Sequence, residues 1–260
     1  MPATTLEIVR VAALSDNYTF LLHAPDSGET AVVDTPEVAP IRAALAERGW
    51  TLTHIFNTHH HPDHVGGNLA LKAETGCVIV GPAADRDRIP GLDRAVGEGD
   101  RVSLGASTAV VWDTPAHTRG HIAFHFADDK AIFVGDTLFS VGCGRLFEGT
   151  AAQMWAAMQR FRKLPDDTRV FCAHEYTASN IRFARHIDPH NAALVALEAE
   201  VGRQRAAGVA TVPSTIGIER QTNPFMRADD PGLARAVNLE GADAAAVLGA
   251  IRGAKNRFRG

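Results

Sequence analysis

The chain has 260 residues, of which 45% are hydrophobic and 22% are charged, which excludes an intrinsically disordered or low-complexity protein. Its net charge of -4 disfavours a nucleic-acid-binding protein, because contacts to phosphates need clustered lysine and arginine. The length allows one large domain, or a core domain with a smaller appendage.

Targeting and redox signals indicate a soluble cytoplasmic protein. The segment from Met1 to Glu7 has neither the basic nor the apolar region of a signal peptide, and no apolar run is long enough to span a bilayer. The three cysteines, Cys77, Cys143 and Cys172, are odd in number and far apart. This pattern fits a reducing compartment better than a disulfide framework.

The first half of the chain is predicted to be rich in short strands. Apolar runs between turn residues predict strands over 6–14, 18–23 and 30–34. A helix is expected from Val38 to Arg48, since Gly49 follows as a stop signal. The same patterns predict a helix over 69–75 and strands over 54–57, 77–80, 100–104, 108–112, 122–126, 131–134 and 170–173.

The second half becomes increasingly helical. A helix is expected over 152–164, and helical periodicity is clear over 192–207 and 242–252. Strands grouped with a few helices predict a layered α/β domain. We therefore place a boundary near residue 175 and expect a smaller, mostly helical second domain.

The segment His59-His60-His61-Pro62-Asp63-His64 is the clearest chemical signal. In an extended segment side chains alternate, so His59 and His61 are expected on one side and His60 elsewhere. The turn made by Pro62 and the following glycines lets Asp63 and His64 converge from the other side. Imidazole and carboxylate suit zinc, iron or manganese, and this many ligands in one loop indicates two ions.

Three further polar residues follow apolar strands in the same manner. They are His117, Asp136 and His174, and each is a weak candidate alone, because a lone histidine after a strand is usually structural. Jointly with the histidine loop they predict one site at the ends of the strands. The alternative is a chance cluster of surface histidines, which the position between an apolar strand and a Gly-Gly turn disfavours.

These motifs resemble those of the metallo-β-lactamase superfamily. The stretch Thr58 to Asn68 carries the resemblance, with Gly135-Asp136-Thr137 and His174-Glu175-Tyr176. The chain is similar throughout to the hydroxyacylglutathione hydrolase (glyoxalase II) branch, on the segments 142–150 and 223–227 and on the helical C-terminal region. The resemblance implies an αβ/βα sandwich over residues 1–174, as the catalytic domain, and a helical glutathione-binding domain over 175–260.

The resemblance also implies the ligand set. One ion would be held by His59, His61 and His117, the other by Asp63, His64 and His174, and Asp136 would bridge them. The expected metals are two divalent ions per chain, zinc first, with iron or manganese as alternatives. Asp63 and Asp136 are the residues assigned to catalysis.

The implied reaction is hydrolysis of S-(2-hydroxyacyl)glutathione, with S-D-lactoylglutathione as the expected substrate, in the detoxification of methylglyoxal. Two adjacent cations lower the pKa of a bridging water, so that hydroxide can attack the thioester carbonyl. The thiolate leaving group has a conjugate pKa of roughly 8.5, so no acid residue is required. Asp34 is either a strand-ending turn residue or a carboxylate that orients a ligand.

Glutathione carries two carboxylates, so its site needs cationic or amide donors. The resemblance assigns this role to Arg145, Phe147, Tyr176, Arg252 and Lys255. Arg145 and Phe147 stand where the animal-type pattern has lysine and tyrosine, so one hydrogen bond to the substrate is missing or replaced at Phe147. The run from Arg252 to Arg259 would otherwise be interpreted as a solvated basic tail.

Two classes of alternative stay open. One is another enzyme of the superfamily, such as a persulfide dioxygenase with one iron. The other is a non-catalytic metal- or glutathione-binding protein, which would be expected to have lost ligands. We expect a monomer that acts on a small molecule, with neither nucleic acid nor membrane as a partner.

Overall fold

The structure is a computed structural model that describes residues 6–260. The first five residues, on which the expectation of no signal peptide partly depends, lie outside the described residues. The chain forms two compact units. Unit 1 runs to Thr114 and includes Thr118–Gly135, whereas unit 2 consists of Pro115–His117 and Asp136–Gly260.

Unit 1 contains a six-stranded mixed sheet in chain order. Its first three strands are antiparallel, and the later pairs are parallel because helical segments carry the chain back between them. The strands are β1 (Glu7–Ala13), β2 (Asn17–His23), β3 (Thr30–Val33), β4 (His54–Phe56), β5 (Val78–Pro82) and β6 (Arg94–Val96). The helical segments are α1 (Val38–Arg48), α2 (Pro62–Val65), α3 (Asn68–Thr75) and η1 (Ala83–Arg88).

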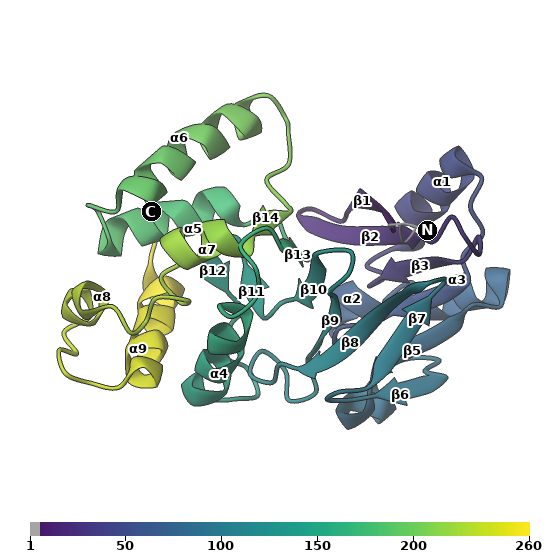
Figure 1. Cartoon of the computed structure of the whole chain (residues 1–260), viewed down its shortest axis with the longest axis horizontal. Helices are drawn as coiled ribbons and strands as arrows, with labels where there is room; N and C mark the ends of the chain where they lie inside the picture. Colours follow the sequence, from purple (N-terminus) through teal and green to yellow (C-terminus); the bar gives the residue numbers. More distant parts are fainter. Residues whose placement is uncertain (1–5) are drawn as a thin grey trace. The chain divides into compact units, whose positions relative to one another are not determined.

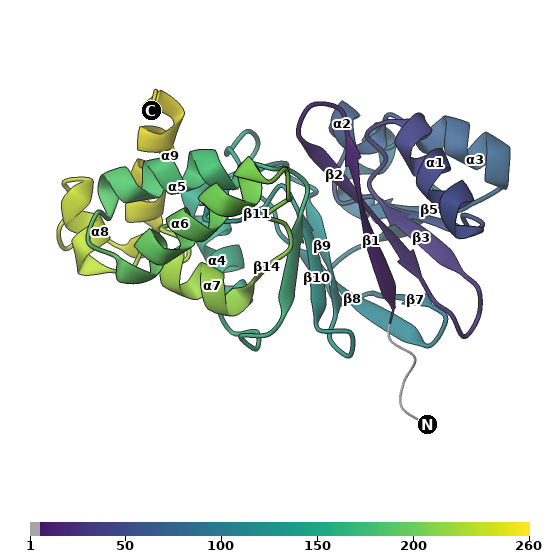
Figure 2. The same cartoon turned by 90° about the horizontal axis from the view of Figure 1, so that it is seen from above.

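A second, antiparallel set of strands completes unit 1. It comprises β7 (Arg101–Leu104), β8 (Ser107–Asp113), β9 (Ile122–Phe126) and β10 (Ala131–Gly135), each paired with the next. Figure 2 shows α1 and α3 on the side of the first sheet that faces away from these strands.

The alternation of side chains explains how unit 1 packs. Ile55 of β4 joins a buried cluster with Ile41 of α1 and Leu71 of α3. Its neighbour Phe56 points to the opposite face and stacks on Phe124 of β9, with ring centroids 5.3 Å apart. Both faces of the first sheet are therefore covered, which explains its continuous apolar runs.

Unit 2 holds the remaining short strands and the helices α4 to α9 (Figure 1). Its strands are β11 (Leu138–Phe139), β12 (Gly142–Cys143), β13 (Arg169–Cys172) and β14 (Ser214–Thr215). Its helices are α4 (Ala151–Phe161), α5 (Thr177–Ile187), α6 (Ala192–Ala206), α7 (Ile216–Thr222), α8 (Pro231–Ala236) and α9 (Ala244–Arg257). Within the unit α4 packs on α9 and α5 packs on α6.

The predicted elements are largely present, with two corrections. The segment 62–65, predicted as a turn, is the helical turn α2, in which Pro62 occupies the first turn, where a missing N–H costs nothing. The C-terminal helix does not end at residue 252 but continues to Arg257, so Lys255 lies on a helix and not in a solvated tail. No helix within residues 6–260 is long and apolar enough to cross a membrane.

Candidate metal centre

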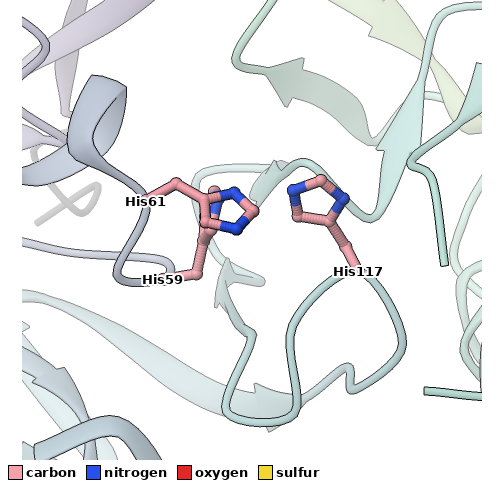
Figure 3. A group of neighbouring side chains, drawn as sticks. All are labelled: His59, His61 and His117. Atoms are coloured by element: carbon pink, nitrogen blue, oxygen red, sulfur yellow. The ribbon is translucent and has the colours of Figure 1, made fainter. Parts of the chain in front are cut away.

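The loop after β4 presents His59 and His61 in unit 1. Nε2 of His59 lies 3.1 Å from Nδ1 of His61, and Figure 3 shows the two rings close together. His60 instead places its Nδ1 3.1 Å from a carboxylate oxygen of the buried Asp85. The loop therefore separates the histidines as the alternation of an extended chain requires.

The helical turn α2 follows this loop and carries Asp63 and His64. His64 is buried, whereas the side chain of Asp63 is about 38% exposed. The carboxylate of Asp63 lies 3.6 Å from Nε2 of His64. Asn17 donates to the same carboxylate and to the Asp63 carbonyl, so the first residue of β2 helps to orient this acidic side chain.

Asp34 organises the ligands of unit 1. It follows β3 in the left-handed conformation, with φ of 59°. Its Oδ1 accepts the backbone N–H of Thr58, and its Oδ2 accepts the Thr58 hydroxyl and Nδ1–H of His64, all at 2.8 Å. Asp34 is thus both the strand-ending residue and the carboxylate that orients a candidate ligand, so the two interpretations of its sequence position are compatible.

The same carboxylate determines which ring nitrogens are protonated. Because the Thr58 hydroxyl donates to Asp34, its oxygen accepts from Nδ1–H of His59, 3.1 Å away. Nδ1 of His64 also donates to Asp34. Both histidines therefore keep the lone pair of Nε2 for a metal ion, as in metal sites where a carboxylate fixes the ligand tautomer.

Unit 2 supplies the remaining candidates, His117 (Figure 3), Asp136 and His174. Nδ1 of His117 donates to the carbonyl of Arg145 at 3.0 Å, which leaves the Nε2 lone pair for a metal ion. One carboxylate oxygen of Asp136 lies 3.4 Å from Nε2 of His117, and the other lies 3.4 Å from Nε2 of His174. Asp136 is therefore directed at two histidines at once.

This donor set fits metal ions. Ligand atoms about 2.0–2.2 Å from a tetrahedral ion are separated from one another by roughly 3.4 Å, which matches the spacing around Asp136. A carboxylate with a histidine nitrogen facing each oxygen is the arrangement expected of a bridging ligand. The imidazole and carboxylate donors suit zinc, iron and manganese.

The residues assigned to the substrate are brought together only in part. Arg145, Phe147 and Arg252 line one hollow in unit 2, together with Gly249, Gly253 and Asn256. Phe147 is 58% exposed, and its ring lies 5.2 Å from that of His117. Arg252 is nearly buried and donates to the carbonyl of Cys143 at 2.7 Å, so it also holds the chain just before Arg145.

The other two residues assigned to the substrate, Tyr176 and Lys255, do not line this hollow. The ring of Tyr176 stacks on that of His174, with an interplanar angle of 1°. Lys255 donates to the carbonyl and hydroxyl of Ser179 on α5 and is not among the residues lining the hollow. Burial, together with the cations of Arg252 and Arg182, lowers the pKa of Lys255 to about 8.

Sequence reasoning missed Asp85, the partner of His60. Asp85 is buried and also pairs with Arg88. In the sequence it begins the alternating run Asp85-Arg86-Asp87-Arg88, which is typical of a solvated surface segment. No local signal distinguishes the one buried carboxylate in that run.

Comparisons with known proteins cover almost the whole chain. Residues 14–174 match the family model described as the metallo-beta-lactamase superfamily, and residues 175–258 match that described as the hydroxyacylglutathione hydrolase C-terminus. A hydroxyacylglutathione hydrolase of Methylococcus capsulatus is 53% identical over 98% of this chain and 100% of its own length. One of Hyphomonas neptunium is 51% identical over 97% of this chain and 98% of its own. Among solved structures, ETHE1 from Myxococcus xanthus has a TM-score of 0.65 at 24% identity and covers 96% of this chain and 97% of its own, which supports the fold alone.

Asp34→Asn tests the organising carboxylate. Asparagine tolerates the left-handed conformation, but its amide cannot accept all the donors that Asp34 accepts, so one histidine loses its orienting partner. We expect metal affinity to fall by about 10- to 100-fold, measured by competition with a chromophoric chelator. Asp128→Asn, at an exposed position of unit 1, should change nothing; equal affinity in the Asp34 variant and the parent would remove Asp34 from this role.

Proposed function

The chain belongs to the hydroxyacylglutathione hydrolase family within the metallo-β-lactamase superfamily, and on this basis we propose that it hydrolyses S-(2-hydroxyacyl)glutathione, with S-D-lactoylglutathione as its substrate. The products are glutathione and a 2-hydroxy acid, D-lactate in this case, as in the removal of methylglyoxal. The observation that carries the proposal is 53% identity to a hydroxyacylglutathione hydrolase along its entire length. Such similarity includes the C-terminal region, where the family model is specific to this enzyme.

The proposed cofactor is a pair of divalent ions. His59, His61 and His117 would hold one, Asp63, His64 and His174 would hold the other, and Asp136 would bridge them. Zinc is the proposed metal, and the donor types also accept iron or manganese. When bound, such a pair supplies hydroxide near neutral pH and polarises the thioester carbonyl.

The residues around the candidate ligands orient the ligand side chains for this chemistry. Asp34 and the carbonyl of Arg145 hold the tautomers of three histidines, and Asp136 faces two histidines with its two oxygens. No acid residue is needed for the leaving thiolate, whose conjugate pKa is roughly 8.5. Burial raises the pKa of Cys143 to about 11, which makes its thiol a poor nucleophile.

We propose that glutathione binds to residues of both predicted domains, 1–174 and 175–260. Arg145 and Arg252 supply cations at the hollow in unit 2, where a peptide carboxylate finds charge-assisted donors. Phe147 offers an exposed apolar face in place of a hydroxyl. Lys255 and Tyr176 complete the proposed set, Lys255 through a cation that is partly desolvated in the free protein.

The proposal also covers the cellular compartment and the oligomeric state of the protein. The three cysteines are unpaired and buried, which fits a reducing compartment, and we place the enzyme in the cytoplasm. We propose that it acts as a monomer, with the glutathione thioester as its partner.

The decisive experiment is hydrolysis of S-D-lactoylglutathione by the purified protein, with metal analysis of the same sample. We expect turnover that is lost on chelation, with about two metals per chain. Two bound metals without turnover would contradict the proposed substrate but would still support the proposed metal centre. A single bound iron without thioesterase activity would instead favour a persulfide dioxygenase.

Asp136→Ala should abolish turnover and lower the metal content. Removing this carboxylate takes away the two oxygens that face His117 and His174, and with them the proposed bridge between the ions. The measurements are steady-state hydrolysis and elemental analysis after dialysis. Asp166→Ala, at an exposed carboxylate of the same unit, should behave as the parent; retained activity in the Asp136 variant would exclude it from the mechanism.

Lys255→Ala should raise KM for the thioester more than it lowers kcat, because Lys255 would bind a remote part of the substrate. The parent should also lose kcat/KM as the pH rises through about 8, where Lys255 loses its charge. Lys255→Arg should remove this inflection, since arginine stays protonated. An unchanged KM in the alanine variant, or the same inflection in the arginine variant, would show that Lys255 does not contact substrate.

A further inference from the structure

The hairpin formed by β11 and β12 touches all three candidate ligands of unit 2. Phe139 of β11 packs edge-on against the ring of His174, with centroids 5.8 Å apart. After β12, Gly144 passes so close to Asp136 that an added Cβ would collide with the Asp136 carbonyl oxygen. The next residue, Arg145, accepts the hydrogen bond of His117. Phe139 of the hairpin and the two residues that follow it therefore contact one candidate ligand each.

The turn of this hairpin is strained. Its second residue, Val141, has φ of 56°, a conformation that a β-branched side chain rarely adopts. Short hairpin turns normally place glycine, asparagine or aspartate at such positions. Because a valine disfavours this conformation, the surroundings must impose it.

Two polar side chains from the α7 region hold the turn. Glu219 is fully buried, and its Oε2 accepts the backbone N–H of Val141 at 2.8 Å. The amide of Asn223 lies 3.1 Å from the carbonyl of Phe139, 2.9 Å from that of Gly142 and 2.9 Å from Oε2 of Glu219. Glu219 and Asn223 thus bind both strands and the tip of the hairpin.

Burying the carboxyl group of Glu219 costs desolvation free energy. Desolvation raises the pKa of Glu219, and hydrogen bonds from Ser214, Asn223, Val141 and Ser140 oppose that rise. An apolar side chain of similar size would avoid the desolvation cost. An apolar side chain could not, however, accept a hydrogen bond from the N–H of Val141 or from the amide of Asn223.

We infer that Glu219 and Asn223 are positioning residues for the metal centre, which act through the β11–β12 hairpin on His117, Asp136 and His174. They are neither among the candidate ligands nor among the residues lining the hollow, and the inference rests on the metal site proposed above. Loss of either side chain should release the strained turn, move Phe139 and residues 144–145, and so loosen three ligands together. Variants that lack either side chain should therefore bind metal more weakly, while their affinity for the substrate stays nearly unchanged.

The test compares Glu219→Leu, Asn223→Ala and Glu219→Gln with the parent. The first two should lower metal affinity by about tenfold or more, the effect typical of lost ligand-orienting partners. They should also change the visible absorption of the cobalt(II)-loaded protein, which reports ligand geometry without turnover. In kinetics, kcat should fall while KM changes less than about twofold. Glu219→Gln keeps one acceptor oxygen and should recover most of the parental metal affinity.

Leu233→Ala is the matched control. Leu233 is buried in α8 of the same unit, outside the hairpin, and its truncation leaves a cavity that destabilises the fold. It should lower the melting temperature and leave metal affinity and the cobalt spectrum intact. If Glu219→Leu and Asn223→Ala behave like this control, the two residues are only structural and the inference is wrong.

The outcomes separate this inference from the proposed function. Should the parent bind no metal or fail to hydrolyse the thioester, the proposed function fails, whatever the variants do. Should the parent bind two metals and turn over while the variants keep its metal affinity, only the positioning role fails. If Glu219→Leu does not fold, Asn223→Ala and Glu219→Gln give the same comparison.

Discussion

A histidine binds a metal ion through a nitrogen that carries no proton, so the protein must decide which of two nitrogens that is. In unit 1 this decision is made by the carboxylate of Asp34. It accepts from His64 directly and from His59 through the Thr58 hydroxyl. Since all of these groups are buried, water cannot replace the carboxylate, and the orientation of both rings depends on it.

Unit 2 meets the same requirement with backbone and packing. The carbonyl of Arg145 fixes His117, and the stacked ring of Tyr176 and the edge of Phe139 confine His174. A backbone acceptor is only as well placed as the loop that bears it. This explains why buried polar side chains hold the loop over 137–145.

The hollow in unit 2, which we propose binds a carboxylate of the substrate, combines charge with packing. Arg252 is largely buried, contacts the ring of Phe225 and is tied to the Cys143 carbonyl, so its guanidinium is held in place before any ligand arrives. A pre-positioned cation loses less conformational entropy on binding. Lys255 is nearby on the same helix, and the repulsion between these cations, added to burial, weakens its hold on a proton.

The sequence by itself determined the fold class, most strands, the long helices and the chemical type of the site. Apolar runs of four to eight residues and clear caps are local signals, and they placed α1 at its observed bounds. His117, Asp136 and His174 each follow an apolar strand, and this local signal named them as candidates. The resemblance then divided the seven candidate ligands between two ions, which neither alternation nor spacing could do.

The tertiary structure alone decided the parts that depend on burial and on distant neighbours. Asp85 and Glu219 are ordinary acidic residues in the sequence, and only packing shows that each is buried. For Asp34 the sequence left two interpretations open, and its hydrogen bonds show that both hold. Elements of two to seven residues, such as β11, β12 and α7, are too short to show periodicity. Likewise, only the fold reveals that α9 extends to Arg257 and that Val141 is held in a strained turn. Local sequence patterns indicate the secondary structure that a segment prefers. Which buried polar group accepts a hydrogen bond from which donor depends on segments that are far apart in the sequence, so the sequence pattern does not reveal it.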